Sequence, residues 1–144
     1  MASSVSERIP QAVDALPLRP GVRVLEIGCG PGVAAREIVR RYPDAFVLGI
    51  DRSATAIRQA LAGSQNQVSL GQLAFRVAAA ESFALKAGEP AFHFAFALRV
   101  GAFDGRHPEV GLLALPRIGA ALVPGGTLFI DGGSPLRELP LHEA

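Results

Sequence analysis

The stretch Val24-Leu25-Glu26-Ile27-Gly28-Cys29-Gly30-Pro31-Gly32 decides the fold of this chain. Its apolar first part predicts a buried strand over 22–27, which Gly28 closes. Glycines at this point allow the backbone to turn sharply and to pass close to a ligand. Pro31 can open a helix, because the N–H that it lacks is not needed in a first turn. The stretch therefore predicts a strand, a tight loop suited to a ligand, and a helix.

Strands and helices alternate along the rest of the chain. Residues rich in apolar and β-branched side chains predict strands over 22–27, 46–50, 73–79, 92–100 and 127–131. Helical spacing predicts helices over 6–16, 31–42, 53–63 and 109–122, the third capped by Ser53 and the last kinked or split by Pro116. The segment 64–72 is polar and carries no assignment. This alternation is typical of βαβ units and a parallel sheet.

Length and composition narrow the class of protein. A chain of 144 residues suits one domain, over 1–144, with a core of its own. Hydrophobic residues make up 49% of the chain, which indicates a sheet buried on both faces or a surface covered by a partner. The 14 basic and 13 acidic residues balance, and the densest basic group, around Arg40, fits a solvated helix face. The sequence thus lacks the clustered positive charge that nucleic-acid binding requires.

The cysteine count and the apolar stretches indicate the cellular compartment in which we expect the chain. Cys29 is the single cysteine, so no intrachain disulfide can form, and the chain fits a reducing cytoplasm. The first ten residues include Glu7 and Arg8 and have no apolar core, so we expect no signal peptide. The apolar stretch 110–130 is broken by prolines and glycines, and we expect no membrane span. We expect no metal site.

Asp51 is the second feature that points to a ligand. It follows the second predicted strand, and the carboxyl ends of neighbouring parallel strands border one crevice. A carboxylate beside the glycine loop can accept two hydrogen bonds from a ribose diol, which we favour over a role confined to capping the next helix. The dinucleotide pattern G-x-G-x-x-G lacks its third glycine here, because that position is Val33. A nicotinamide-binding domain is therefore the weaker reading.

These motifs together resemble the class I S-adenosylmethionine-dependent methyltransferases. The stretch 24–32 is similar to the family's first motif, an acidic residue followed by G-x-G-x-G, and the stretches 49–51, 78–81, 92–99 and 122–130 are similar to its later motifs in the same order. The resemblance covers residues 5–133. It implies a Rossmann-like three-layer α/β/α sandwich with a mostly parallel five-stranded sheet of order 3-2-1-4-5, lacking the family's usual last two strands.

The resemblance also implies a role for individual residues. Gly28, Cys29, Gly30 and Gly32 would border the amino-acid part of S-adenosylmethionine, Glu26 would order the loop and meet the cofactor ammonium, Asp51 would hold the ribose, Arg52, Ala80 and Glu81 would flank the adenine, and Leu98 would face the sulfonium. Cys29 is interpreted as a small loop residue rather than a reactive thiol.

The chain departs from the family's pattern at two of these motifs. Ala79 stands where an acidic residue is usual, which removes one acceptor for the adenine amine. His93 stands where the family usually has Asp at the start of the fourth strand, and it is interpreted as structural rather than as a base.

The function predicted is methyl transfer from S-adenosylmethionine to a small-molecule acceptor. This reaction depends on alignment of cofactor and acceptor more than on acid–base chemistry, so the sequence assigns no catalytic residue. Asp104 or His107 could deprotonate a hydroxyl or an amine, although each is more readily a plain loop residue. The alternative is a non-catalytic S-adenosylmethionine-binding module or a degenerate partner subunit.

A homodimer is predicted from the edge of the sheet. With the family's last two strands missing, the strand over 127–131 would be an apolar edge that invites pairing with a second chain. The tail, with Leu136, Leu139 and Leu141, could instead cover this edge within its own chain.

Overall fold

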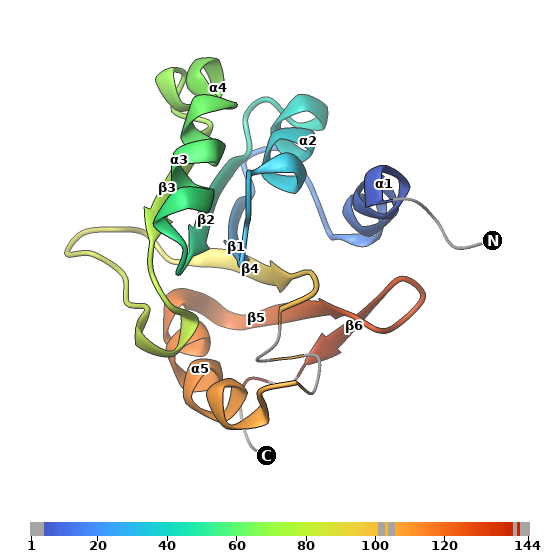
Figure 1. Cartoon of the computed structure of the whole chain (residues 1–144), viewed down its shortest axis with the longest axis vertical. Helices are drawn as coiled ribbons and strands as arrows, with labels where there is room; N and C mark the ends of the chain where they lie inside the picture. The colour runs from blue at the N-terminus through green and yellow to red at the C-terminus, as the bar shows by residue number, and fades with distance from the viewer. Residues whose placement is uncertain (1–4, 101–102, 104–105, 140, 142–144) are drawn as a thin grey trace.

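A six-stranded sheet forms the centre of the fold (Figure 1) in the computed structural model, which describes residues 5–100, 103, 106–139 and 141. The strands are β1 (Arg23–Ile27), β2 (Phe46–Asp51), β3 (Leu73–Val77), β4 (Phe92–Ala97), β5 (Leu122–Asp131) and β6 (Leu136–Leu139). They lie in the order β3-β2-β1-β4-β5-β6. The first five are parallel, and β6 runs antiparallel to β5.

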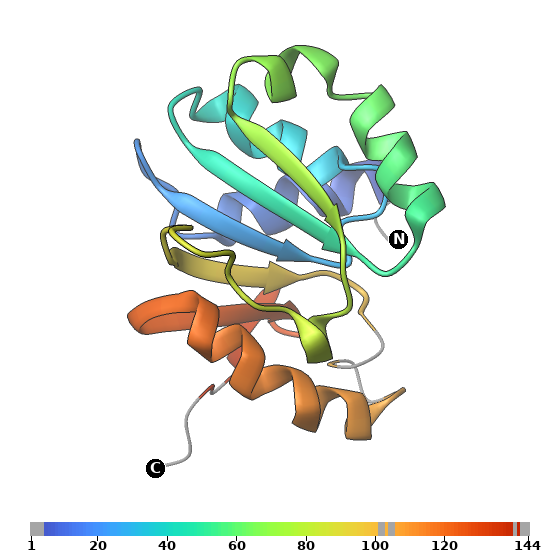
Figure 2. The same cartoon turned by 90° about the vertical axis from the view of Figure 1, so that its left-hand side faces the viewer.

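Helices cover both faces of this sheet (Figure 2). They are α1 (Val5–Ala15), α2 (Val33–Arg41), α3 (Ala54–Ala62), the short α4 (Gln65–Ser69), the 3-10 turn η1 (Ala80–Ser82) and α5 (Pro108–Ala121). α1 and α2 share one buried cluster with the sheet, and α5 and η1 share another. This arrangement confirms the three-layer α/β/α fold and the strand order predicted from the sequence.

The alternation of side chains along β1 explains the two cores. Successive side chains of a strand point to opposite faces. Val24 packs in the cluster of α1 and α2, whereas Leu25 and Ile27 pack in the cluster of α5. Because both faces are covered, the strand reads as a nearly continuous apolar run. Glu26 shares the face of Val24 and is the charged exception, with only 4% of its surface exposed.

The C-terminal edge of the sheet differs from the prediction. The sheet has six strands rather than five, and β5 is not an edge, because β6 pairs with it from Leu128↔Leu139 to Asp131↔Leu136. Gly132, with φ of 110°, lets the chain reverse direction directly after β5. The antiparallel pairing then satisfies the N–H and C=O groups that an open edge would leave free. The tail thus covers the edge of its own chain, which was the alternative to the predicted dimer contact.

Several element boundaries also differ. β3 and β4 end sooner than predicted, and β5 begins five residues sooner, at Leu122, with a register shift between Phe92 and Phe94. α5 is one continuous helix through Pro116, which does not split it. Pro116 lies on the exposed side, where water can satisfy the carbonyl that loses its partner. The predicted cap is confirmed, because the Ser53 hydroxyl accepts a hydrogen bond from the Ala56 N–H at 3.1 Å.

His93 lies at the amino end of β4, far from the carboxyl edge of the sheet. Its Nδ1 accepts a hydrogen bond from the Arg23 N–H at 2.9 Å, so it ties β4 to the start of β1, as expected of a structural residue. In the part of the chain that the structure describes, no helix has the length and apolarity needed to cross a membrane.

Candidate functional site

The glycine loop joins β1 to α2 in a conformation that other residues rarely adopt. Gly28, Gly30 and Gly32 have φ of 68°, 53° and 86°, all in the left-handed region that favours glycine. The Cys29 N–H donates to the Ile50 carbonyl at 3.0 Å, which fixes the loop to the end of β2. A Cβ atom added at Gly30 would meet nothing within 4 Å, so the chain leaves open space above the loop.

Asp51 lies beside this loop, as the strand order predicted. One carboxylate oxygen accepts the Gly30 N–H at 3.0 Å, and the other accepts the Ser53 N–H at 2.9 Å. Asp51 therefore orders both the glycine loop and the start of α3. A carboxylate has about four lone-pair sites, so acceptor capacity remains for a ligand hydroxyl.

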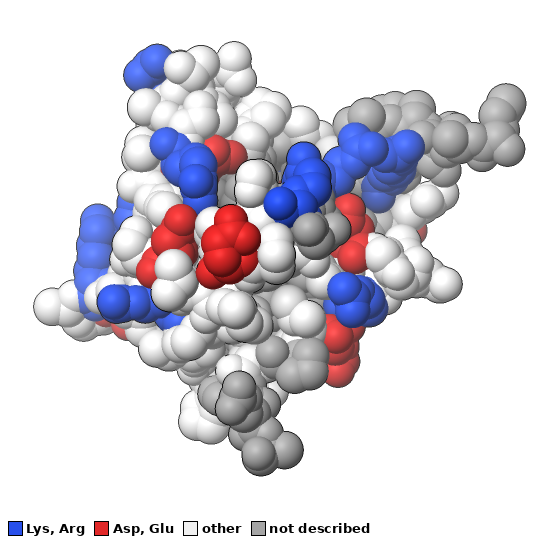
Figure 3. Space-filling view, turned by 60° about the horizontal axis from the view of Figure 1, so that its bottom comes forward, with Lys and Arg blue, Asp and Glu red and all other residues white. Residues whose placement is uncertain are grey.

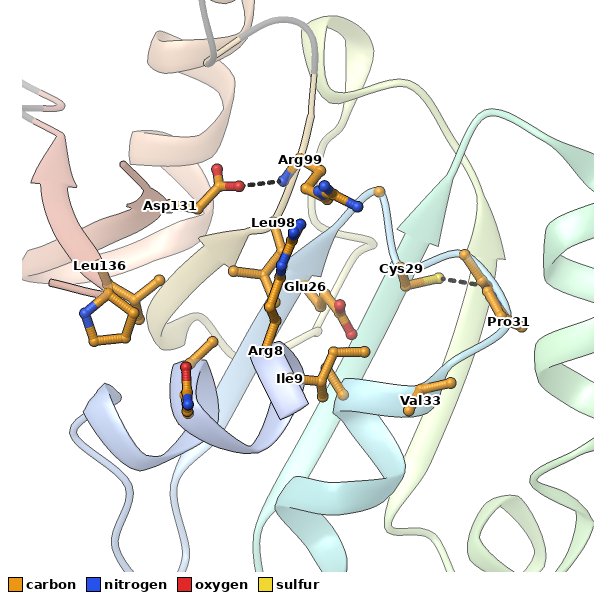
Figure 4. A pocket seen from close by; sticks show the side chains of 16 residues that line it. Arg8, Ile9, Glu26, Cys29, Pro31, Val33, Leu98, Arg99, Asp131 and Leu136 are labelled. Carbon is orange, nitrogen blue, oxygen red and sulfur yellow. Dashed lines mark hydrogen bonds between the residues drawn. The ribbon is translucent and has the colours of Figure 1, made fainter. Parts of the chain in front are cut away.

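Two cavities meet at the glycine loop, along the carboxyl edge of the sheet. The first has a volume of about 380 Å³ and the second about 420 Å³. Of the residues predicted from the sequence, Glu26, Gly28, Cys29, Gly30 and Leu98 line the first cavity (Figure 4), and Gly28, Asp51, Arg52 and Ala80 line the second. Gly28 and Arg99 line both. The two cavities thus form one cleft divided at these two residues.

Gly32 and Glu81 were also predicted for the site, and they line neither cavity. A Cβ atom at Gly32 would lie 3.0 Å from the Phe75 ring and 3.3 Å from Ala60, so this glycine allows α2 to pack closely against the sheet. Glu81 instead pairs with Arg52 at 3.0 Å, which links η1 to the end of β2 at the rim of the second cavity.

Glu26 is a buried carboxylate with an unused acceptor atom. Burial, with a smaller contribution from the negative charge of Asp51, raises the pKa of Glu26 to about 8, and Arg36 opposes this shift. Its Oε1 atom has no hydrogen-bond partner among the described residues. Buried polar atoms are nearly always paired, so this oxygen is suited to a donor supplied by a ligand. A ligand ammonium beside it would satisfy the atom and favour its ionised form.

The Cys29 thiol is not suited to nucleophilic chemistry. Burial raises its pKa well above the usual range, and the charges of Glu26 and Asp51 raise it further. Because the thiolate is the reactive form of cysteine, this side chain stays protonated and acts as a small packing residue of the loop.

The far wall of the first cavity was not found from the sequence. It comes from segments distant in the chain: Arg8, Ile9, Gln11 and Ala12 of α1, Arg99 after β4, Asp131 at the end of β5, and Pro135 and Leu136 at the start of β6. No local motif marks these residues. The rule that ligands bind at the carboxyl ends of parallel strands would have found Asp131.

The two loop residues considered as bases have different positions. His107 lines the second cavity, beside Asp51 and Ala80. Asp104 lies outside the described residues. Within the described part of the chain, no group of three or more His, Cys, Asp or Glu side chains is placed to hold a metal ion. On the face drawn in Figure 3, acidic and basic side chains are interspersed rather than gathered by sign.

Comparison with known proteins places the chain in a family. The family model described as "Methyltransferase domain" matches residues 24–126, from β1 into β5. The chain is 34% identical over 139 residues to a trans-aconitate 2-methyltransferase from Methylobacterium nodulans, over 94% of this chain and 48% of that protein. The fold, the glycine loop and the cleft are therefore those of a class I S-adenosylmethionine-dependent methyltransferase domain. The chain belongs to the methyltransferase domain family, for which S-adenosylmethionine is the cofactor.

Solved structures share the fold. A methyltransferase from Geobacter sulfurreducens, in complex with S-adenosyl-L-homocysteine, has a TM-score of 0.65 at 23% identity over 86% of this chain and 47% of that one. The cyclase SpnF has a TM-score of 0.70 at 25% identity over 86% of this chain and 43% of that one. The chain spans about half the length of the curated relatives it matches.

Proposed function

We propose that this chain binds S-adenosylmethionine in the divided cleft and transfers its methyl group to a small molecule. One observation carries the proposal. The glycine loop lies between two carboxylates, the buried Glu26 on the side of the first cavity and Asp51 on the side of the second. A cofactor with an ammonium at one end and a ribose diol in its middle matches this arrangement of acceptors on either side of the loop.

Different residues of the cleft contact different parts of the cofactor. Asp51 accepts from the ribose hydroxyls, and Glu26 accepts from the ammonium through Oε1, which has no hydrogen-bond partner among the described residues. Arg52 and Ala80 flank the adenine in the second cavity, with Glu81 held at its rim by Arg52, and Leu98 borders the sulfonium in the first. Gly28 and Gly30 leave room for the amino-acid part, and Gly32 supports the loop from behind. The cofactor supplies the reactive methyl group, and the chain supplies alignment.

The acceptor occupies the outer part of the first cavity. This wall is mostly apolar, with Ile9, Ala12 and Leu136, and carries Arg8 and Arg99 as its cations. The matched curated relatives are named for trans-aconitate, so this small polycarboxylate is the first acceptor to test. Asp131 is the carboxylate of this wall and could take a proton from a hydroxyl or amine acceptor.

A turnover assay tests the proposal. The full chain is incubated with S-adenosylmethionine carrying a labelled methyl group, with trans-aconitate and a panel of small hydroxyl, amine and carboxylate compounds. We expect label in the product and none with the Gly30→Val variant. Binding of S-adenosylmethionine without transfer to any acceptor would contradict the catalytic part of the proposal.

That outcome would support the second candidate, a non-catalytic S-adenosylmethionine-binding module or a degenerate partner subunit. One observation favours it. A protein with the same fold is named a cyclase rather than a methyltransferase. Addition of a full-length partner that restores turnover would distinguish the degenerate subunit from the plain binding module.

The organisation and location of the chain form part of the same proposal. Residues 1–144 act as one cofactor-binding domain in the cytoplasm, where a buried, unoxidised Cys29 is expected. Two chains associate as a homodimer through β6, the outermost strand at this edge among the described residues, rather than through β5. Leu112 and Leu113, 74% and 64% exposed on α5, add apolar surface for such a contact. Sedimentation at micromolar concentration tests this, and a 15.0 kDa monomer would contradict it.

A further inference from the structure

Arg99 has a backbone conformation that arginine rarely adopts. It follows Leu98 at the end of β4 and has φ of 56°. Among the described residues it is the one non-glycine residue with a positive φ. Such strained residues persist when their surroundings hold them, and they gather at functional sites. This backbone conformation therefore matters for where it places the Arg99 side chain.

Two neighbouring segments hold the Arg99 backbone. Its N–H donates to Oδ2 of Asp131 at 3.1 Å, which fixes it to the end of β5 (Figure 4). Its carbonyl accepts from a guanidinium nitrogen of Arg106 at 3.0 Å. The two contacts act on both sides of the same residue, so the left-handed turn at Arg99 is determined by the tertiary structure and not by its own preference.

The side chain that this turn positions lies between the two cavities. Arg99 lines both, and in Figure 4 it extends from the end of β4 toward the glycine loop. Its guanidinium makes no hydrogen bond or ion pair with another described residue, whereas Arg52 pairs with Glu81 and Arg76 with Glu89. A guanidinium presents a planar fork of donors that matches the two oxygens of a carboxylate.

We propose that Arg99 binds a ligand carboxylate at the junction of the two cavities and that Asp131 positions it for this role. The inference rests on the proposed function, because both ligands of the cleft can carry a carboxylate. One is the amino-acid end of the cofactor, and the other is an acidic acceptor. Glu26 and Asp131 are the carboxylates of the chain in the same cavity. Glu26 is proposed to accept from the ligand ammonium, and Asp131 uses one oxygen on the backbone of Arg99, so the Arg99 guanidinium remains for a ligand carboxylate.

The Arg99→Gly variant separates this role from a structural one. Glycine adopts the left-handed conformation freely, so the variant should be at least as stable as the native chain in urea unfolding. Arg19→Gly is the matched control, since Arg19 is an exposed arginine whose φ is not positive, and it should lower stability. A loss of stability in Arg99→Gly as large as in the control would overturn the proposal.

Binding measurements identify the source of the carboxylate. Calorimetry measures the affinity of the free chain for S-adenosylmethionine and for its decarboxylated analogue. It also measures the affinity of the S-adenosylhomocysteine-bound chain for trans-aconitate. If Arg99 binds the cofactor carboxylate, Arg99→Gly lowers the affinity for S-adenosylmethionine by about tenfold or more and leaves the affinity for the decarboxylated analogue unchanged. If Arg99 instead binds the acceptor carboxylate, Arg99→Gly lowers only the affinity for trans-aconitate. Unchanged affinity for every carboxylate ligand that the native chain binds would overturn the proposal. A native chain that binds no S-adenosylmethionine would instead contradict the proposed function.

The positioning role of Asp131 has its own test. Asp131→Ala removes the acceptor of the Arg99 N–H and should lower the affinity for the same ligand as Arg99→Gly does. Asp131→Asn keeps a carbonyl acceptor and should retain most of that affinity. Because Asp131 is proposed to act through Arg99, the Asp131→Ala change should have no further effect in the Arg99→Gly variant. Additive losses in the double variant would overturn the positioning role.

Discussion

The two walls of the cleft are built in different ways. The cofactor wall comes mainly from two adjoining strands and the loop between β1 and α2, over residues 24–51, and backbone geometry at Gly28 and Gly30 shapes it. The acceptor wall comes from α1, the end of β4 and the β5–β6 turn, which the fold brings together from both ends of the chain. A short motif can encode the first wall, whereas the second exists only in the folded chain. Changes in the first wall should therefore abolish cofactor binding, and changes in the second should spare it, apart from Arg99, which lines both cavities.

The largest effect is expected for Gly30→Val. A Cβ at Gly30 meets nothing within 4 Å in the free chain, so the side chain fits the fold but fills the space above the loop, with strain of about 1–3 kcal/mol from the positive φ. Calorimetry should show no binding of S-adenosylmethionine by a folded variant. Gly49→Val is the control, since its Cβ would lie 2.8 Å from Phe75 and 2.9 Å from Cys29, and it should unfold the sheet. Normal binding by Gly30→Val would show that the cofactor does not approach this loop.

Asp51→Ala should have the next largest effect. It removes the ribose acceptor and frees the Gly30 N–H from its partner. A hydrogen bond to a charged group contributes about 1.5–3 kcal/mol, so S-adenosylmethionine affinity should fall by about tenfold or more. Asp51→Asn keeps one carbonyl oxygen, so its affinity for S-adenosylmethionine should lie between those of the native chain and Asp51→Ala. Unchanged affinity in a folded Asp51→Ala variant would remove Asp51 from the site.

Glu26 predicts a pH effect on the cofactor wall. Its pKa is about 8 in the folded chain and about 4.3 in an unfolded one, so between these values only the folded chain keeps the proton. Stability should therefore fall as the pH rises through this window. Glu26→Gln cannot ionise and should be more stable than the native chain at pH 8.5 by roughly 2–4 kcal/mol, with little difference at pH 5. Urea unfolding at both pH values measures this. Equal pH slopes for the two chains would refute the buried, protonated state.

The smallest effect on the cofactor is expected from truncation after Gly133. This change removes β6, with Leu136 of the acceptor wall, and exposes β5 as an open edge. S-adenosylmethionine affinity should change by less than about threefold, while the shortened chain should self-associate more strongly. Sedimentation and calorimetry on the same sample report both. Truncation after Leu139, which keeps β6, serves as the control, and a large loss of cofactor affinity in the shorter chain alone would remove the distinction between the walls.

The sequence predicted what local chemistry dictates. The glycine loop, the ends of β1 and β2 and the Ser53 cap follow from residue types that only certain backbone conformations favour. The parallel arrangement follows from the alternation of predicted strands and helices, and the strand order follows from the resemblance to the methyltransferase family. These features place Asp51 beside Gly30 before any contact is known.

The sequence did not predict what distant segments decide together. β6 has two polar residues between two leucines, without the alternation that marks a strand, and it forms a strand because β5 offers an edge. Pro116 reads as a break, yet packing of Ala114 and Ile118 holds α5 together around it. Arg99 carries no signal at all, since its conformation depends on Asp131, thirty-two positions along the chain.

Calorimetry with S-adenosylmethionine, S-adenosylhomocysteine and NAD tests the central claim most directly, because all three place a ribose in a glycine-loop cleft. The account predicts saturable binding of the first two, lost in Gly30→Val and weakened in Asp51→Ala, and no binding of NAD, for which Val33 replaces the third glycine of the dinucleotide loop. Binding of NAD in preference to S-adenosylmethionine, or binding of S-adenosylmethionine that both variants retain, would contradict it.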